Sequence, residues 1–278
     1  MRIKIDYTTT YDYSQPANSV VQLLRVRPRS GWDQHVTRWR VDVDADGALR
    51  TGTDVFGNTT HMFTADAPVT RLVLTVAGEV DTNDAHGAVR GFPEPLTSGT
   101  FLRTTPLSVC DAAMADFARS FHGDELERLH ELLRAVHGHM AFDGYATSTE
   151  TDAPTAFSQA RGVCQDYTHI FCAVARTMGI PARYVSGHFV RADGATTQPA
   201  SHAWAEALVP HLGWVGFDPT NGISITPAHV RVAVGLDYLD AAPVRGARRG
   251  GGTEGMHVSV TAVDMATLTA QSQQQGQA

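Results

Sequence analysis

The sequence predicts an α+β protein in which a β-rich N-terminal part, interpreted as an antiparallel β-sandwich, precedes a part where helices are followed by strands. The first observation is period-two alternation of apolar residues from Met1 to about Thr82, which is typical of half-buried strands. The second is a change to helical spacing after residue 107, where an apolar stripe recurs every three or four residues: Leu126, Leu129, Leu133, Val136 and Met140. The third is the return of strand-like segments after Gly179.

Turn residues divide the N-terminal part into strands. Alternating apolar positions run over residues 3–7, 21–23, 41–43 and 72–76. The dipeptide Gly57-Asn58 lies between two apolar pairs, a pattern that suits a tight hairpin. Residues 83–106 lose the alternation and are rich in glycine and proline, as connectors are. We therefore predict an N-terminal β-domain over residues 1–95 and a linker over residues 96–107.

The second part begins with three predicted helices. The first starts near Ser108, a candidate cap, the second covers Asp124–Phe142, and the third covers Cys164–Met178, with a glycine after it as the stop signal. The strands predicted next are Ala182–Val190, His202–Val209, Trp214–Phe217 and, as a candidate to pair back, His257–Val263. We assign residues 108–265 to this second domain. The residues 266–278, rich in Gln, Ser and Thr, are predicted to be a disordered tail.

Composition and charge exclude several classes of partner. The chain has 278 residues and a formal net charge of −7, and no run of five basic residues occurs, so nothing favours nucleic acid. No segment approaches the roughly 20 apolar residues of a membrane span, and residues 1–7 lack the apolar core of a signal peptide. We therefore expect a cytoplasmic protein without a membrane partner. Three cysteines favour a reactive thiol over a disulfide framework.

Cys164 is the cysteine best placed for chemistry, because it opens the third predicted helix after a segment with loop character. Unpaired backbone N–H groups and the positive end of the helix dipole stabilise a thiolate there, and the same N–H groups can bind an oxyanion. A nucleophilic thiol also needs a group that accepts and returns a proton near neutral pH, for which imidazole is the usual choice.

His202 and Asp218 are the candidate partners of this thiol. His202 shares one face of a predicted strand with Trp204 and Glu206, and Asp218 ends the next apolar strand. A carboxylate in that position holds an imidazole in one tautomer. The order Cys164, His202, Asp218 therefore predicts a nucleophile, a base and an orienting acid.

Four motifs of the second part point to a known family. They are Gly-Val-Cys-Gln-Asp at 162–166, Gly-Ile-Pro-Ala-Arg-Tyr-Val-Ser-Gly at 179–187, Ser-His-Ala-Trp at 201–204 and Gly-Phe-Asp-Pro-Thr-Asn-Gly at 216–222. With these motifs the chain resembles the bacterial transglutaminase-like proteins over about residues 108–240. The β-rich first part is similar to the β-domain that precedes this core in many bacterial members.

The resemblance implies a papain-like core, in which a helix carrying Cys164 packs on an antiparallel sheet that carries His202 and Asp218. It implies that Cys164 attacks a carboxamide of a protein or peptide substrate, forms a thioester, and contributes its own amide as one oxyanion donor. An amine or water then takes the acyl group, so a transferase and a cysteine protease or amidase are both alternatives. An inactive peptide-binding module is a third. No cofactor is implied, and the oligomeric state stays open.

Several neighbouring residues have simpler explanations. Cys172 lies on the same predicted helix as Cys164 and is expected in the core, and Cys110 has no accompanying histidine motif. Asp166 is expected to complement the helix dipole. No catalytic role is assigned to Gln165. Trp204 and Trp214 either line a cleft or fill the core. His169 and His188 either support the site residues or are structural, and the structural interpretation is favoured.

Two partial metal motifs do not form complete sites. Residues 42–47 begin like a calcium loop, but Thr53 stands where a bidentate Glu is needed. His130-Glu131 opens like a zinc-binding helix, but Arg134 replaces the second histidine. We therefore predict no metal, and we interpret the Asp-Gly pair at 46–47 as a β-turn.

Overall fold

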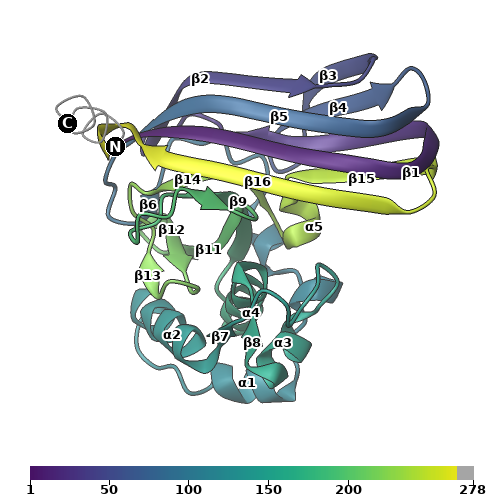
Figure 1. Cartoon of the computed structure of the whole chain (residues 1–278). Helices are drawn as coiled ribbons and strands as arrows, with labels where there is room; N and C mark the ends of the chain where they lie inside the picture. Colours follow the sequence, from purple (N-terminus) through teal and green to yellow (C-terminus); the bar gives the residue numbers. More distant parts are fainter. Residues whose placement is uncertain (268–278) are drawn as a thin grey trace, which may run out of the picture.

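Two large β-sheets, a short two-stranded sheet and a group of helices make up the structure, a computed structural model that describes residues 1–267 (Figure 1). The larger sheet contains β1 (Arg2–Arg27), β2 (Gln34–Val43), β3 (Gly47–Thr53), β4 (Thr59–Ala65), β5 (Val69–Thr82), β10 (Thr197–Gln198), β15 (Val244–Gly250) and β16 (Glu254–Asp264). The smaller contains β6 (Ala88–Val89), β9 (Ala182–Phe189), β11 (His202–Val209), β12 (Gly213–Asp218), β13 (Ile223–Ser224) and β14 (His229–Gly235). A short parallel pair joins β7 (Ala141–Phe142) and β8 (Arg161–Gly162).

The helices lie mostly on the far side of the smaller sheet from the larger one (Figure 1). They are η1 (Ser98–Leu102), η2 (Pro106–Ser108), α1 (Ala112–Ala118), α2 (Glu125–His139), α3 (Ala153–Gln159), α4 (Cys164–Thr177) and α5 (Tyr238–Ala241). Within residues 1–267, none of these helices is long and apolar enough to cross a membrane.

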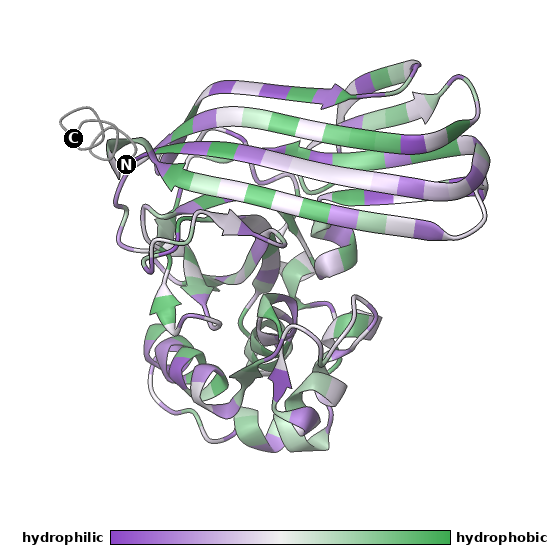
Figure 2. Ribbon diagram, in the orientation of Figure 1, coloured by the Kyte–Doolittle hydropathy of each residue, from purple (hydrophilic) through white to green (hydrophobic). Residues whose placement is uncertain are grey.

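The long strand β1 builds the predicted β-sandwich by contributing to both of its layers. Residues 3–13 pair with β5 and β16, whereas residues 21–24 pair with β4 and β15. Tyr7 from the first half and Leu24 from the second meet in one buried cluster between the layers. Figure 2 shows hydrophobic and hydrophilic residues alternating along these strands, which is the pattern that one buried face requires. The antiparallel sandwich is therefore confirmed.

Strands from the end of the chain complete this sandwich. The strand predicted over residues 257–263 lies within β16, which pairs along β1 from Ile3↔Asp264 to Tyr13↔Glu254. It pairs there because Val260 and Ala262 alternate toward the buried side. Residues 244–264, assigned from the sequence to the second domain, thus lie in the sheet of the first. The boundaries at 95, 107 and 265 stay predictions, and the predicted tail lies outside the described residues from 268 onward.

Helix α4 is the centre of the second part and is confirmed where the sequence predicts it. It is buried along nearly its whole length, because the smaller sheet covers one side and α1, α2 and α3 pack on the others. Residues Ile170, Phe171 and Val174 lie in the largest buried cluster together with Phe217 of β12. The antiparallel order β13-β12-β11-β9-β14 places β11, in the middle of this sheet, next to α4.

The structure differs from the prediction at several element ends. Asp111, and not Ser108, caps α1, because its carboxylate accepts a hydrogen bond from the Met114 amide at 2.9 Å. Helix α2 ends at His139 instead of Phe142, and neither α3 nor β14 is predicted. The predicted linker contains η1 and η2, which bury Phe101 and Leu107 and so attach it to the core.

Candidate active site

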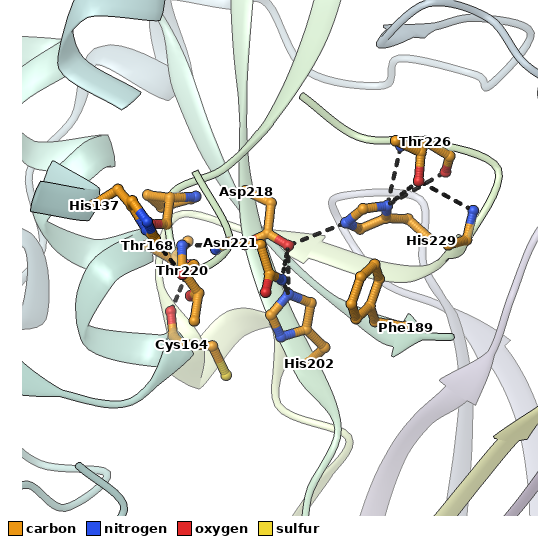
Figure 3. A network of polar contacts seen from close by, with 12 residues as sticks. His137, Cys164, Thr168, Phe189, His202, Asp218, Thr220, Asn221, Thr226 and His229 are labelled. Carbon is orange, nitrogen blue, oxygen red and sulfur yellow. Dashed lines mark hydrogen bonds and ion pairs between the residues drawn. The ribbon is translucent and has the colours of Figure 1, made fainter. Parts of the chain in front are cut away.

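The three predicted site residues come together at one edge of the smaller sheet (Figure 3). His202 begins β11 and Asp218 ends β12, and these antiparallel neighbours place Ala205 opposite Phe217. The start of one strand and the end of the next therefore share an edge. Cys164, the first residue of α4, packs against the small buried cluster that contains Ala203 of β11, and so reaches the same edge.

Both carboxylate oxygens of Asp218 accept hydrogen bonds. Its Oδ2 accepts hydrogen bonds from the ring nitrogen Nε2 of His202 at 2.7 Å and from the Asn221 side-chain amide at 2.6 Å. Its Oδ1 accepts from the backbone amides of Thr220 at 3.1 Å and Asn221 at 3.2 Å. Burial by itself would raise the pKa of Asp218, but the adjacent histidines hold it well below its ordinary value. The carboxylate is therefore charged at neutral pH.

His202 is held between this carboxylate and the thiol. Its Nε2 faces Asp218, so Nδ1 is the nitrogen that remains for Cys164, and Figure 3 shows both side chains directed to the same space. Burial opposes the charged imidazolium, but the Asp218 carboxylate and the Cys164 thiol outweigh it and raise the pKa of His202 to about 10. The site is thus arranged to keep a proton on this imidazole next to a sulfur atom.

The local structure before α4 fixes the position of Cys164. The Asp166 carboxylate accepts from the Val163 amide at 2.7 Å and from the Thr147 hydroxyl at 2.6 Å, which caps the helix. A Cβ at Gly162 would lie 2.4 Å from Asp166 Oδ2, so only glycine fits there. The thiol is partly exposed, with Sγ 4.0 Å from the Ser201 carbonyl oxygen. Asp166 thus has the helix-end role that the sequence indicates.

His229, at the start of β14, is a residue that the sequence analysis missed. The Thr226 amide donates to its Nδ1 at 3.0 Å, so the proton sits on Nε2, which donates to Asp218 Oδ2 at 3.1 Å. Burial lowers the pKa of His229 and keeps the ring neutral. The available signal was a histidine that opens an alternating strand, as His202 does, but β14 itself was not predicted.

The remaining candidates have structural positions. Cys172 is fully buried, and burial raises its pKa to about 11. His169 is also fully buried and its Nε2 accepts from the Tyr238 amide at 3.1 Å, while burial lowers its pKa to about 3. Trp204 and Trp214 lie in one buried cluster, as the interpretation that they fill the core requires.

Glu206 continues the face of β11 that begins with His202, and it is fully buried. Its carboxylate forms ion pairs with Arg183 at 2.6 Å and Arg231 at 2.7 Å, both of which are also buried. Burial would raise the pKa of Glu206, but the two guanidinium groups hold it below its ordinary value.

A metal ion could be held by one set of donors in the described part of the chain. The donor atoms of His202, Asp218 and His229 all lie within 4.8 Å of one another. In the structure these atoms already form hydrogen bonds, with protons on both imidazoles pointing at the carboxylate. A cation would need the same lone pairs, so metal binding and this hydrogen-bonded arrangement exclude each other.

Comparisons with known proteins agree with this architecture. The chain matches the family model for the transglutaminase-like superfamily over residues 114–219 and the model for the bacterial transglutaminase-like N-terminal region over residues 3–81. It is 31% identical over 284 residues to the uncharacterized protein ML0607 of Mycobacterium leprae, covering 93% of this chain and 97% of the relative. It is 27% identical over 277 residues to protein Rv2569c of Mycobacterium tuberculosis, covering 88% of this chain and 87% of the relative.

The fold also matches a crystal structure. A proposed cysteine protease from Cytophaga hutchinsonii superposes with a TM-score of 0.75 at 21% identity, over 95% of this chain and 91% of that one. The likeness covers both the β-sandwich and the helical part, so the fold is shared over nearly the whole chain.

Proposed function

The chain belongs to the transglutaminase-like superfamily, and on that premise we propose that it is a thiol-dependent acyl-transfer enzyme that attacks a carboxamide. Cys164 is the proposed nucleophile, His202 the general acid and base, and Asp218 the orienting carboxylate. The observation that supports this best is the position of His202, 2.7 Å from Asp218 and next to the Cys164 thiol, with its pKa raised to about 10.

The first half of the proposed reaction forms a thioester. The Cys164 thiolate attacks the carboxamide carbon, and the negative charge that develops on the oxygen is stabilised by the Cys164 backbone N–H at the start of α4. The C–N bond then breaks, and the proton on His202 passes to the leaving nitrogen, so that ammonia or an amine departs. Asp218 keeps the ring of His202 in one orientation throughout.

The second half returns the enzyme to its starting state. An acceptor amine or a water molecule loses a proton to His202 and attacks the thioester carbon, and the Cys164 thiolate is released. The acceptor decides whether the enzyme is a transglutaminase or a cysteine protease or amidase. The fold likeness to the Cytophaga hutchinsonii protein is compatible with both acceptors.

The first experiment tests the thiol without a substrate. Iodoacetamide modification of Cys110, Cys164 and Cys172 is followed against pH by peptide mass spectrometry in the wild type, His202→Ala and Asp218→Asn. We expect Cys164 alone to react fast well below pH 8 and to lose that advantage in His202→Ala. If Cys164 reacts like an ordinary thiol in all three proteins, the enzyme proposal is wrong and the peptide-binding alternative takes its place.

A second experiment separates the two acceptors. A glutamine-containing peptide is incubated with and without a primary amine, and both ammonia release and amine incorporation are measured. Cys164→Ser is the control for background deamidation. Incorporation at the expense of hydrolysis indicates a transferase, and release that is insensitive to the amine indicates a hydrolase.

A further inference from the structure

Strand β14, which carries His229, is the outer strand of the smaller sheet on the side of the β-sandwich (Figure 1). It pairs with β9 along one edge, and within residues 1–267 no strand pairs with its other edge. Residues 229–235 are all buried, so the backbone groups on that edge are shielded from water. Buried N–H and C=O groups need hydrogen-bond partners, so other parts of the molecule must supply them here.

Two side-chain amides of the β-sandwich take the place of the missing strand. Gln34, the first residue of β2, accepts from the Arg231 amide at 2.9 Å and donates to the Arg231 carbonyl at 2.8 Å. Asn58, which precedes β4, accepts from the Val234 amide at 2.8 Å and donates to the Val234 carbonyl at 2.7 Å. Each amide thus forms with one residue of β14 the two hydrogen bonds that a residue of a neighbouring antiparallel strand would form.

A β-bulge allows both amides to bind the same edge. The register of β14 against β9 shifts between Arg231 and Ala233, which inserts one extra residue into β14. In a regular strand, residues three apart direct their backbone groups to opposite edges, but the extra residue turns Arg231 and Val234 to the same edge. Gln34 and Asn58 are 2% and 1% exposed, so water does not compete for these hydrogen bonds. The β-sandwich is therefore attached to β14 at two defined points.

The attachment holds the chain on both sides of His229. Thr82, the residue paired with Gln34 at the end of β5, donates from its hydroxyl to the Pro227 carbonyl at 2.6 Å. The chain is thus held two residues before His229 by Thr82 and two residues after it by Gln34. Between these points, Nε2 of His229 donates to Asp218 Oδ2 at 3.1 Å. The contacts with the β-sandwich therefore fix the part of the backbone that directs this ring to the carboxylate.

We propose that Gln34 and Thr82 are positioning residues that hold His229 against Asp218, so that the β-sandwich is part of the active site. The inference rests on the proposed function and deepens it. One oxygen, Asp218 Oδ2, accepts from both His229 and His202, and two donors on the same oxygen fix the orientation of the carboxylate. A displaced His229 leaves the carboxylate free to turn away from His202.

Nuclear magnetic resonance of protein with isotopically labelled histidine tests the position of the ring. The His229 Nε2–H signal is assigned by its absence in His229→Phe, and the exchange of this proton with water is measured at pH 7. Gln34→Met keeps the length of the side chain and forms neither hydrogen bond to Arg231. We expect exchange roughly tenfold faster in this variant than in the wild type, because hydrogen bonds that oppose local opening are lost.

Alkylation of Cys164 by iodoacetamide at pH 7 tests the effect on the thiol and needs no substrate. We expect the rate to fall about threefold in Gln34→Met and in Thr82→Val, because a less firmly oriented carboxylate supports the His202 imidazolium less well. Thr82→Ser keeps the hydroxyl and should recover the wild-type rate. In a His229→Phe background, Gln34→Met should have no further effect, because the proposed route runs through His229.

Gln22→Met is the matched control. Gln22 is also a buried glutamine of the β-sandwich, 6% exposed, but its side chain lies against Gly246 of β15. The same chemical change at this position should leave the exchange of the His229 proton and the alkylation rate of Cys164 as in the wild type. The control therefore separates a loss of position from a general loss of stability.

Each outcome decides for or against the proposal. Equal exchange of the His229 proton in Gln34→Met and Gln22→Met overturns it, and so does faster exchange without a fall in the Cys164 rate. An equal fall of that rate in the wild-type and His229→Phe backgrounds also overturns it. If Gln34→Met does not fold, Thr82→Val and Thr82→Ser decide by the same measurements. A wild-type Cys164 that reacts like an ordinary thiol refutes the proposed function instead, and the His229 proton alone then decides on the attachment.

Discussion

Two carboxylates are buried on neighbouring strands of one sheet, and they have opposite partners. The Asp218 cluster, formed by Asp218, His202, His229 and Asn221, surrounds a carboxylate with groups that are neutral or can give up a proton. The Glu206 cluster, formed by Glu206, Arg183 and Arg231, surrounds a carboxylate with two positively charged guanidinium groups.

The difference shows that a buried charge does not by itself mark a functional site. Both carboxylates have pKa values held below the ordinary value for Asp or Glu. Only the Asp218 cluster contains a group whose proton can move, and only this cluster lies at the sheet edge beside a partly exposed thiol. We therefore assign the Asp218 cluster to chemistry and the Glu206 cluster to structure, and four predictions test this division.

The largest effect is expected for His202→Ala on activity. Loss of the proposed general acid and base should lower the turnover of a glutamine peptide on the order of 10,000-fold. Above about pH 10, where the raised pKa of His202 no longer contributes stability, the free energy of unfolding should change by only about 1 kcal/mol, because Asp218 keeps its bonds from Asn221 and His229. Steady-state kinetics and urea unfolding measure the two quantities. A large loss of stability would place this histidine with the structural cluster.

Glu206→Gln should have the opposite profile. The change takes a carboxylate away from two buried arginines, of which Arg183 keeps its ion pair with Glu94, so the free energy of unfolding should fall by roughly 3 to 5 kcal/mol. Glu254→Gln, which removes the exposed partner of Arg248, is the matched control and should cost about 1 kcal/mol or less. Urea denaturation compares the three proteins, and equal midpoints for the two variants would contradict the structural role.

The pH dependence of activity should distinguish the two clusters on the alkaline side. Because the pKa of His202 is raised to about 10, the protonated ring persists well above pH 6.5, and kcat/KM should fall only as pH rises through about 10. The stability that this raised pKa contributes is likewise complete below about pH 6.5 and is lost as the pH rises through about 10.

Asp218→Asn is the control for this profile. Removing the carboxylate should move the alkaline limb of kcat/KM down by about two pH units, since an adjacent opposite charge is a main cause of the shift. Asp218 and Cys164 are the groups that raise the pKa of His202, so Glu206→Gln should leave the limb in place. An alkaline limb at the same pH in wild type and Asp218→Asn would show that the carboxylate does not set the pKa of His202.

The smallest effect is expected for His229→Phe. The phenyl ring fits the contacts with Phe189 and Trp204 but removes one donor to Asp218, so kcat should fall about tenfold with little change in KM. His229→Gln retains a side-chain N–H and should recover part of the loss. Equal activity in both variants would show that this histidine only fills space.

The three predicted site residues could be located from the sequence because each lies at the end of a helix or strand that the local pattern predicts. Cys164 opens a helix with a strong apolar stripe, and His202 and Asp218 lie at the ends of short apolar strands. His229 and the carboxylate-facing role of Asn221 could not be predicted, because both depend on how the segment after β12 returns to the sheet. Likewise, β14 was not predicted, because its sequence carries a buried arginine, Arg231, whose ion pair with Glu206 is formed only in the folded chain.

The sequence by itself determined the local elements: the amphipathic helix that carries Cys164, the alternating strands of the sandwich, and the order in which Cys164, His202 and Asp218 follow one another. Local periodicity and helix-end signals are enough for these features, since each involves residues only a few positions apart. Only the tertiary structure decided that β16 closes the sandwich on β1 and that two histidines share one carboxylate. These contacts join residues far apart in the chain, and they form when burying the apolar faces brings those segments together.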